Sequence, residues 1–107
     1  MVDEICERLL RESNAVSVVL IDSNAHVLAH AGESVDLSEV WERYGGAFDG
    51  SETFAKGAKV HASLTRITDA VILIVLFDEQ SSLGLVRLRV KKCHDDLARA
   101  LTTPTLH

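Results

Sequence analysis

The side chains most able to do chemistry stand in a short basic row near the C-terminus. Arg87, Arg89 and Lys91 alternate with apolar residues in the segment LGLVRLRVKK. Cations at such spacing can bind phosphate groups, nucleic acid or an acidic partner. Alternation with a period of two is typical of a strand with one basic face. The pattern therefore predicts a strand over residues 83–91, whose basic face is either solvated or paired with acids, or docks a partner.

The overall charge argues against nucleic acid as that partner. The chain has 16 acidic and 11 basic residues and a formal net charge of −5, whereas nucleic-acid-binding domains normally carry a basic excess. It also lacks the glycine-rich phosphate-binding patterns G-x-x-x-x-G-K-[ST] and G-x-G-x-x-G. We therefore expect no nucleic-acid partner, no nucleotide bound by a known motif and no other cofactor.

The remaining chemically versatile residues do not form a catalytic or metal-binding pattern. Cys93 and His94 are adjacent, and side chains at i and i+1 diverge on a helix. His26 and His30 would lie roughly 13 Å apart along a strand, too far to share a metal ion. There is no G-x-S-x-G motif, and no set of polar residues indicates a ligand-sensing pocket. We expect no catalytic residue, no metal site and no enzymatic activity.

The cellular location follows from what the chain lacks. The first ten residues carry acids where a signal peptide needs basic residues. The longest apolar run, over residues 70–77, is far too short to span a membrane. Cys6 and Cys93 are interpreted as two buried thiols rather than a disulfide. The expected location is cytoplasmic.

The first third of the chain predicts a helix followed by a hairpin. Apolar residues in the N-terminal segment recur at helical spacing, at Val2, Ile5, Cys6, Leu9 and Leu10. The segments AVSVVLID and HVLAHAG then read as two strands. They are joined by a turn over residues 22–25, in which Asn24 is expected to adopt the left-handed conformation.

A central helix is expected to begin near Leu37. Asp36 can cap it and Glu39 can complete a capping box. Its apolar stripe consists of Leu37, Val40, Trp41 and Tyr44. The aromatic pair either packs the helix on the sheet or meets a partner, because Trp and Tyr are enriched in interface hot spots. Arg43 lies just beside that stripe.

The rest of the chain predicts three strands and a closing helix. Residues 47–58 are expected to be a loop with a helical turn, residues 60–68, 70–77 and 83–91 to be strands, and residues from Cys93 to Leu101 to be a helix that ends before Pro104. The element order is α-β-β-α-β-β-β-α. We expect an α+β fold, with one five-stranded, mainly antiparallel sheet flanked by helices, in a single domain over residues 1–102 with a short tail over 103–107.

An open sheet has two edge strands that can pair with another chain. A homodimer built edge to edge is therefore expected. The strand over residues 60–68 is taken as the edge, with Leu64 and Ile67 at the dimer contact.

A family resemblance rests on the element order and on three segments: VVLIDSNAHVLAHAG, GAK at 57–59 and FDEQSSLGLVRLRVKK at 77–92. In these features the sequence resembles the Roadblock/dynein-light-chain domain family. The similarity covers about residues 2–45 and 54–102. The resemblance implies a dimeric platform, built from central helices and edge strands, on which a Ras-like small GTPase sits. The implied function is to dock or regulate that GTPase, including as a GTPase-activating partner, in cell polarity or motility.

On this reading the residues that meet the partner are Leu37, Val40, Trp41, Arg43, Tyr44, Arg87 and Arg89. An alternative is a structural adaptor that dimerises with itself or with another Roadblock protein and contacts no GTPase. The adaptor is favoured by a central helix and following loop that are roughly three turns shorter than in the polarity-regulating members. Those members also have a long C-terminal tail, and this sequence stops at His107.

Overall fold

A computed structural model of the chain describes residues 2–24, 26–34, 42, 52–57 and 59–102. Its elements are α1 (Val2–Ser13), β1 (Ser17–Asp22), β2 (Val27–Gly32), β3 (Glu52–Ala55), β4 (His61–Thr68), β5 (Val71–Phe77) and α3 (Leu83–Thr102). The strands form one five-stranded sheet in the order β2-β1-β5-β4-β3. Every neighbouring pair is antiparallel. The predicted α+β fold with a five-stranded antiparallel sheet is confirmed.

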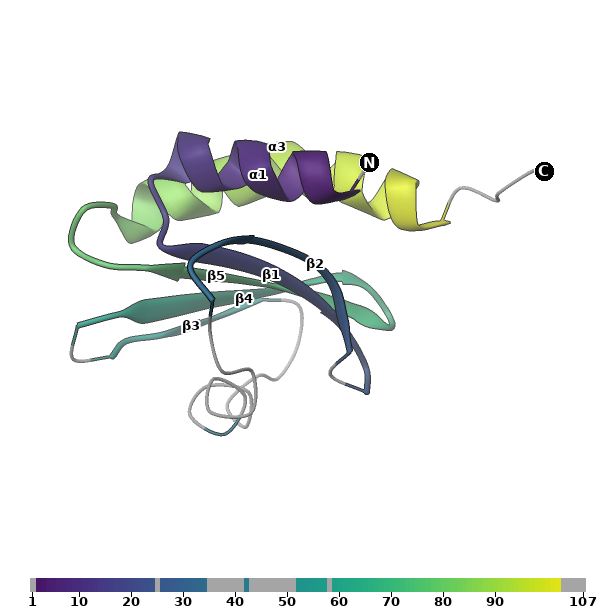
Figure 1. Cartoon of the computed structure of the whole chain (residues 1–107), viewed down its shortest axis with the longest axis horizontal. Coiled ribbons are helices and arrows are strands. Elements are labelled where there is room, and N and C mark those ends of the chain that lie inside the picture. The colour runs from purple at the N-terminus through teal and green to yellow at the C-terminus, as the bar shows by residue number, and fades with distance from the viewer. Residues whose placement is uncertain (1, 25, 35–41, 43–51, 58, 103–107) are drawn as a thin grey trace.

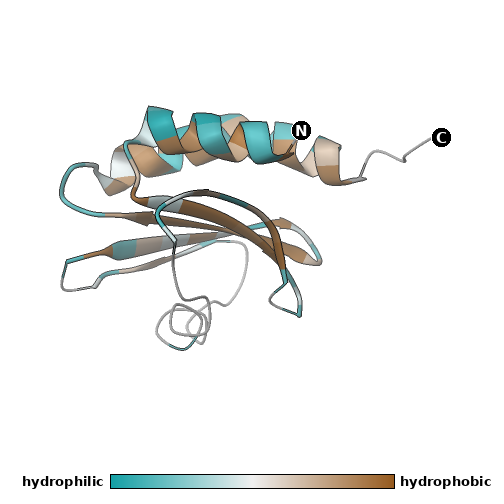
Figure 2. Ribbon diagram, viewed as in Figure 1, coloured by the Kyte–Doolittle hydropathy of each residue, from teal (hydrophilic) through white to brown (hydrophobic). Residues whose placement is uncertain are grey.

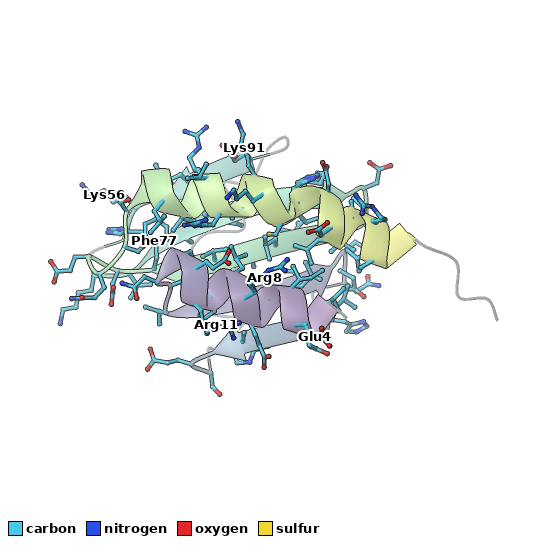
Figure 3. All side chains as sticks on the ribbon, turned by 90° about the horizontal axis from the view of Figure 1, so that it is seen from above. Glu4, Arg8, Arg11, Lys56, Phe77 and Lys91 are labelled. Carbon is cyan, nitrogen blue, oxygen red and sulfur yellow. The ribbon has the colours of Figure 1, made fainter. Side chains whose placement is uncertain are left out.

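Helices α1 and α3 lie side by side across one face of the sheet (Figures 1 and 3). Strand β5 runs through the middle of the sheet, and all of its residues are buried. Leu73 and Val75 join the core beneath the helices, whereas Ile72 and Ile74 join a second apolar cluster on the opposite face. Figure 2 shows the apolar colouring of this central strand beneath the polar outer surfaces of the helices. The sheet is thus apolar on both of its faces.

The N-terminal helix and the hairpin form as predicted, but the turn uses different chemistry. The carboxylate of Asp22 accepts hydrogen bonds from the backbone N–H groups of Asn24 and His26, both at 2.9 Å. The bond from His26 is the main reason why the pKa of Asp22 is lowered, and the bond from Asn24 adds to it. Among the described residues other than glycine, the left-handed one is Asn14, with φ of 56°, at the end of α1. The expectation that Asn24 is left-handed was wrong, because the Asp22 side chain holds the turn.

The predicted strand over residues 83–91 is wrong, because this segment forms the first half of helix α3. The Ser82 hydroxyl accepts a hydrogen bond from the Leu85 N–H at 3.2 Å, as an N-cap does. Buried residues recur at helical spacing at Val86, Val90, Cys93 and Leu97. Leu88, which a strand would place on the same face as Val86 and Val90, is instead 53% exposed.

The fifth strand lies in a segment that was expected to be a loop with a helical turn. Residues Glu52–Ala55 form β3 and pair with β4 from Thr65 to Ala62. The predicted number of strands was therefore correct, although residues 83–91 were wrongly predicted as a strand and residues 52–55 were wrongly predicted as part of a loop. The predicted central helix lies outside the described residues except for Glu42, which is helical, and the tail 103–107 also lies outside them.

The predicted edge strand is wrong as well. β4 lies between β5 and β3, so the edges of the sheet are β2 and β3. Leu64 and Ile67 on β4 are only 0% and 6% exposed. Both side chains are part of the core: Ile67 joins the cluster beneath the helices and Leu64 the cluster on the opposite face of the sheet.

In the part of the chain that the structure describes, no helix is long and apolar enough to cross a membrane.

Candidate partner-binding site

The residues predicted to meet a partner fall into two groups. Leu37, Val40, Trp41, Arg43 and Tyr44 lie outside the described residues. Arg87 and Arg89 lie in the first half of α3. The described part of the candidate site is therefore the surface of this helix and the strands beside it.

The helix divides the basic row between two sides. Residues two apart on an α-helix are rotated by about 200°, so Arg87 and Arg89 face opposite sides of α3. Leu88 lies between them and is 53% exposed. Lys91 and Lys92 follow it one turn later and are also exposed. A single basic face was predicted, and it is replaced by an exposed leucine that is flanked by cations.

Arg87 is on the side of α3 that faces β3. Its Nη2 lies 3.2 Å from Oε1 of Glu52, and both side chains are partly exposed. The interpretation of the row as acid-paired therefore holds for Arg87. A pocket of about 310 Å³ lies between α3 and β4 and is lined in part by Glu52, Arg66 and His94. The His94 Nε2 lies 3.2 Å from the Arg66 carbonyl oxygen, so this ring bridges α3 and β4.

The two thiols are buried between α1 and α3. Burial is the main reason why the pKa of Cys6 rises to about 12 and that of Cys93 to about 11. The Cys93 thiol donates to the Val90 carbonyl oxygen at 3.5 Å, while His94 points to β4. Cys93 and His94 thus do not form a nucleophile and base. Among the described residues, no group of three or more His, Cys, Asp or Glu side chains is arranged to hold a metal ion.

Both edges of the sheet expose apolar side chains. On β3, Phe54 is 41% exposed and stacks on Phe77, with ring centroids 5.9 Å apart. On β2, Val27 is 50% and Leu28 39% exposed. Sequence reasoning missed Phe54, although Thr53-Phe54 has the β-branched and aromatic character of a strand. Phe54 is a further candidate for contact with another chain.

The chain is similar to several solved structures. It superposes on Myxococcus xanthus MglB with a TM-score of 0.81 and 30% identity, covering 99% of this chain and 91% of that one. For the gliding protein MglB of Thermus thermophilus the TM-score is 0.75 and the identity 26%, with 90% of this chain and 84% of that one covered. A Roadblock/LC7 domain from Streptomyces avermitilis gives a TM-score of 0.75 at 14% identity, with 94% and 98% covered.

No family model and no curated protein matches the sequence. The similarity to MglB nevertheless extends over almost the whole chain, and the order of strands and helices agrees with the Roadblock/LC7 fold. The resemblance drawn from the sequence is confirmed. This chain belongs to the Roadblock domain family, in which it is similar to MglB.

Proposed function

We propose that this chain is a non-enzymatic Roadblock regulator that docks a Ras-like small GTPase and alters its nucleotide cycle in cell polarity or gliding motility. The observation that carries the proposal is the 30% identity to MglB over 99% of the chain, which involves the whole domain rather than one motif. The similar Thermus protein is described as a gliding protein. The proposed partner surface combines Leu37, Val40, Trp41, Arg43 and Tyr44 with Arg87 and Arg89.

The exposed surface of α3 supports a protein partner. Leu88 is a large apolar side chain at 53% exposure, and cations at Arg87, Lys91 and Lys92 lie around it. An apolar centre with a charged rim is the usual composition of a protein interface. Such a surface favours a partner with an apolar contact ringed by acids, since like charges across an interface are unfavourable.

Complex formation with the Ras-like GTPase of the same cell tests the proposal. The GTPase is loaded with GDP or with a non-hydrolysable GTP analogue, and binding is measured by calorimetry. Arg87→Ala should weaken the complex roughly tenfold if Arg87 contributes as an interface hot spot. Arg11→Ala, which removes an exposed cation from α1, is the matched control and should change binding less than twofold. Absence of binding in both nucleotide states would refute the proposal.

Arg43 separates two ways of accelerating GTP hydrolysis. An arginine finger supplied in trans contributes about 10³–10⁵ in rate, whereas repositioning of the GTPase's own residues needs no such side chain. If Arg43 is the finger, Arg43→Ala should abolish acceleration while the complex still forms. Retained acceleration in this variant would assign the effect to repositioning.

A structural adaptor is the second candidate, and the edge strand β3 favours it. Among the described strands, β3 pairs only with β4, and its exposed Phe54 gives the open edge an aromatic contact. If this edge paired with a second Roadblock chain, the open edge and the Phe54 side chain would both be buried. Light scattering after size exclusion should show a dimer that Phe54→Lys weakens and Leu28→Lys, on the opposite edge, leaves intact. A strictly monomeric chain that also ignores other Roadblock proteins would eliminate the adaptor.

A further inference from the structure

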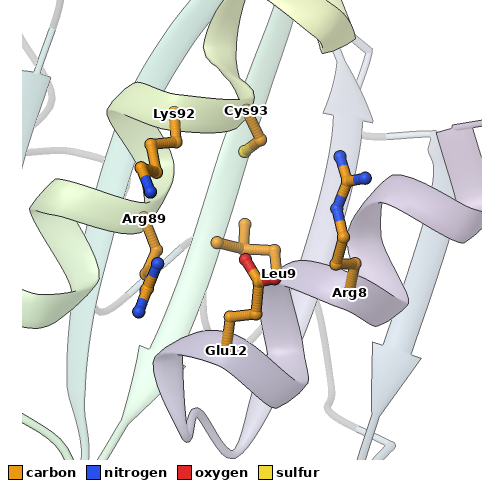
Figure 4. A pocket seen from close by; sticks show the side chains of 6 residues that line it. All are labelled: Arg8, Leu9, Glu12, Arg89, Lys92 and Cys93. Carbon is orange, nitrogen blue, oxygen red and sulfur yellow. The ribbon is translucent and has the colours of Figure 1, made fainter.

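A cavity of about 210 Å³ lies between α1 and α3 and is chemically unlike the rest of this acidic protein. Arg8, Leu9 and Glu12 line it from α1, and Arg89, Lys92 and Cys93 line it from α3 (Figure 4). Three cations and one carboxylate give this lining a net charge of +2, whereas the whole chain carries −5. The buried side chains of Leu9 and Cys93 supply its apolar part.

The basic side chains of this cavity are poorly satisfied. The Nε–H of Arg89 is buried and has no hydrogen-bond partner among the described residues. A buried donor without an acceptor is rare in native structures and calls for an explanation. Nη2 of Arg8 lies 3.6 Å from Oδ2 of Asp96. Both side chains are about half exposed, so this ion pair is weak. Within the described residues no ion pair is formed by Lys92 or Glu12.

We propose that this cavity is a binding site for a small phosphorylated anion. The Nε–H of Arg89 is buried, so the guanidinium can offer its Nη–H groups to the oxygens of a phosphate group, a bidentate geometry that suits arginine. Lys92 adds a point charge from the next turn of α3, and Arg8 adds a third cation from α1.

The size and position of the cavity select the class of ligand. About 210 Å³ equals the liquid volume of roughly seven water molecules, enough for one or two phosphate groups. The proposal goes beyond GTPase docking. Arg89 and Lys92 are shared with the proposed partner surface, but the proposal does not depend on docking, because the test below uses the chain without any GTPase.

Titration of the full-length, ¹⁵N-labelled chain with inorganic pyrophosphate tests the site. The NMR signals of the Arg89 Nε–H and of the Leu9 and Cys93 backbone amides should shift and saturate. Sodium chloride at the same ionic strength is the reference and should cause no saturating shift. Inorganic phosphate, titrated in parallel, should bind more weakly, since it offers one phosphate group to three cations.

A matched pair of variants identifies the cavity as the place of binding. Lys92→Gln should weaken pyrophosphate binding roughly tenfold, because a charge-assisted hydrogen bond is lost. Lys91→Gln removes the same charge from the neighbouring residue, which lines the other cavity. The helix is about 10 Å thick and the Debye length at physiological salt is about 8 Å. Lys91→Gln should therefore weaken pyrophosphate binding less than about twofold.

The acidic residue of the lining gives a test of opposite sign. Glu12→Gln should tighten binding several-fold by removing a carboxylate from the cavity, whereas Glu4→Gln, in the first turn of α1 and outside the lining, should not. Arg89→Gln should abolish the saturable shift. Lys91 and Lys92 are exposed, so replacing either with glutamine should not disturb folding. The proposal is overturned if pyrophosphate causes no saturable shift, or if Lys91→Gln and Lys92→Gln weaken binding equally.

Discussion

Strand β5 and the first half of helix α3 are neighbours in the sequence and were both expected to be strands. β5 is apolar at every position and is buried on both faces. The α3 segment alternates apolar and basic residues, yet only its helical row at Val86 and Val90 is buried. A continuous apolar run of strand length thus predicted its structure well, whereas a short alternating run did not. Strict alternation covers only the six residues 86–91, and Val86 and Val90, at i and i+4, also fit one face of a helix.

The largest expected effect is on β5. Leu73→Ala should lower the free energy of unfolding by about 2–5 kcal/mol, because Leu73 is 0% exposed and its removal leaves a cavity. Leu88→Ala on α3 deletes the same group from a side chain that is 53% exposed and should change the stability by less than about 0.5 kcal/mol. Urea denaturation measures both. Equal losses would mean that Leu88 is buried, as a strand at 83–91 requires.

The buried side of α3 should also make stability depend on alkaline pH. The pKa of Cys93 is raised from 9.0 to about 11 in the folded chain, chiefly by burial. The protonated thiol therefore contributes stability that is fully present below pH 9 and is lost as pH rises towards 11. Thermal unfolding at a series of pH values should show this decline, and Cys93→Ala should show a shallower one. An identical slope in both proteins would contradict the burial of this thiol.

A substitution at Gly84 tests by a smaller change in stability whether the start of α3 is a helix or a strand. Gly84 lies in the first turn of α3, and apart from its chain neighbours and the nearby backbone of the helix no atom lies within 4 Å of where a Cβ would stand. Gly84→Ala should therefore raise the free energy of unfolding by up to about 1 kcal/mol, since alanine favours helix. Gly32→Ala is the control of opposite sign, because Gly32 has φ of +91° and a Cβ would stand 2.5 Å from the Val16 carbonyl oxygen. Destabilisation by Gly84→Ala would argue against the helix.

The smallest effect concerns the contact between α3 and β3. A double-mutant cycle on Arg87→Ala and Glu52→Ala should give a coupling energy of about 0–1 kcal/mol, because both partners are substantially exposed. The coupling should fall further in 1 M salt. A coupling of zero at low salt would show that the pair does not form in solution.

Local patterns were informative where a segment has one dominant way to bury its apolar residues. Helix α1 buries Ile5, Cys6 and Leu9, which belong to the stripe from which the helix was predicted. β3 was missed because a four-residue strand between glycines carries little signal and is defined by its pairing with β4. The edge of the sheet was misassigned for the same reason, since strand order depends on partners distant in the sequence.

The basic residues of the candidate sites could be identified from the sequence, but their positions relative to one another could not. The basic residues were visible in the sequence, but a strand would have placed Arg87, Arg89 and Lys91 on one face. The helix instead directs Arg87 to Glu52 and Arg89 to the cavity that Arg8 also lines. That cavity was not foreseen, because Arg8 and Arg89 are separated by most of the chain and meet only where α1 packs beside α3.

Residue types and their spacing were enough to predict the apolar central strands, the amphipathic N-terminal helix, the fold class and the family. These properties follow from the type and spacing of neighbouring residues, which decide what a short segment can bury. Tertiary structure decided the helical course of residues 83–91, the internal position of β4 and the gathering of cations between α1 and α3. The physical reason is that strand pairing and helix packing depend on contacts between distant segments, and those contacts choose among local structures of similar free energy.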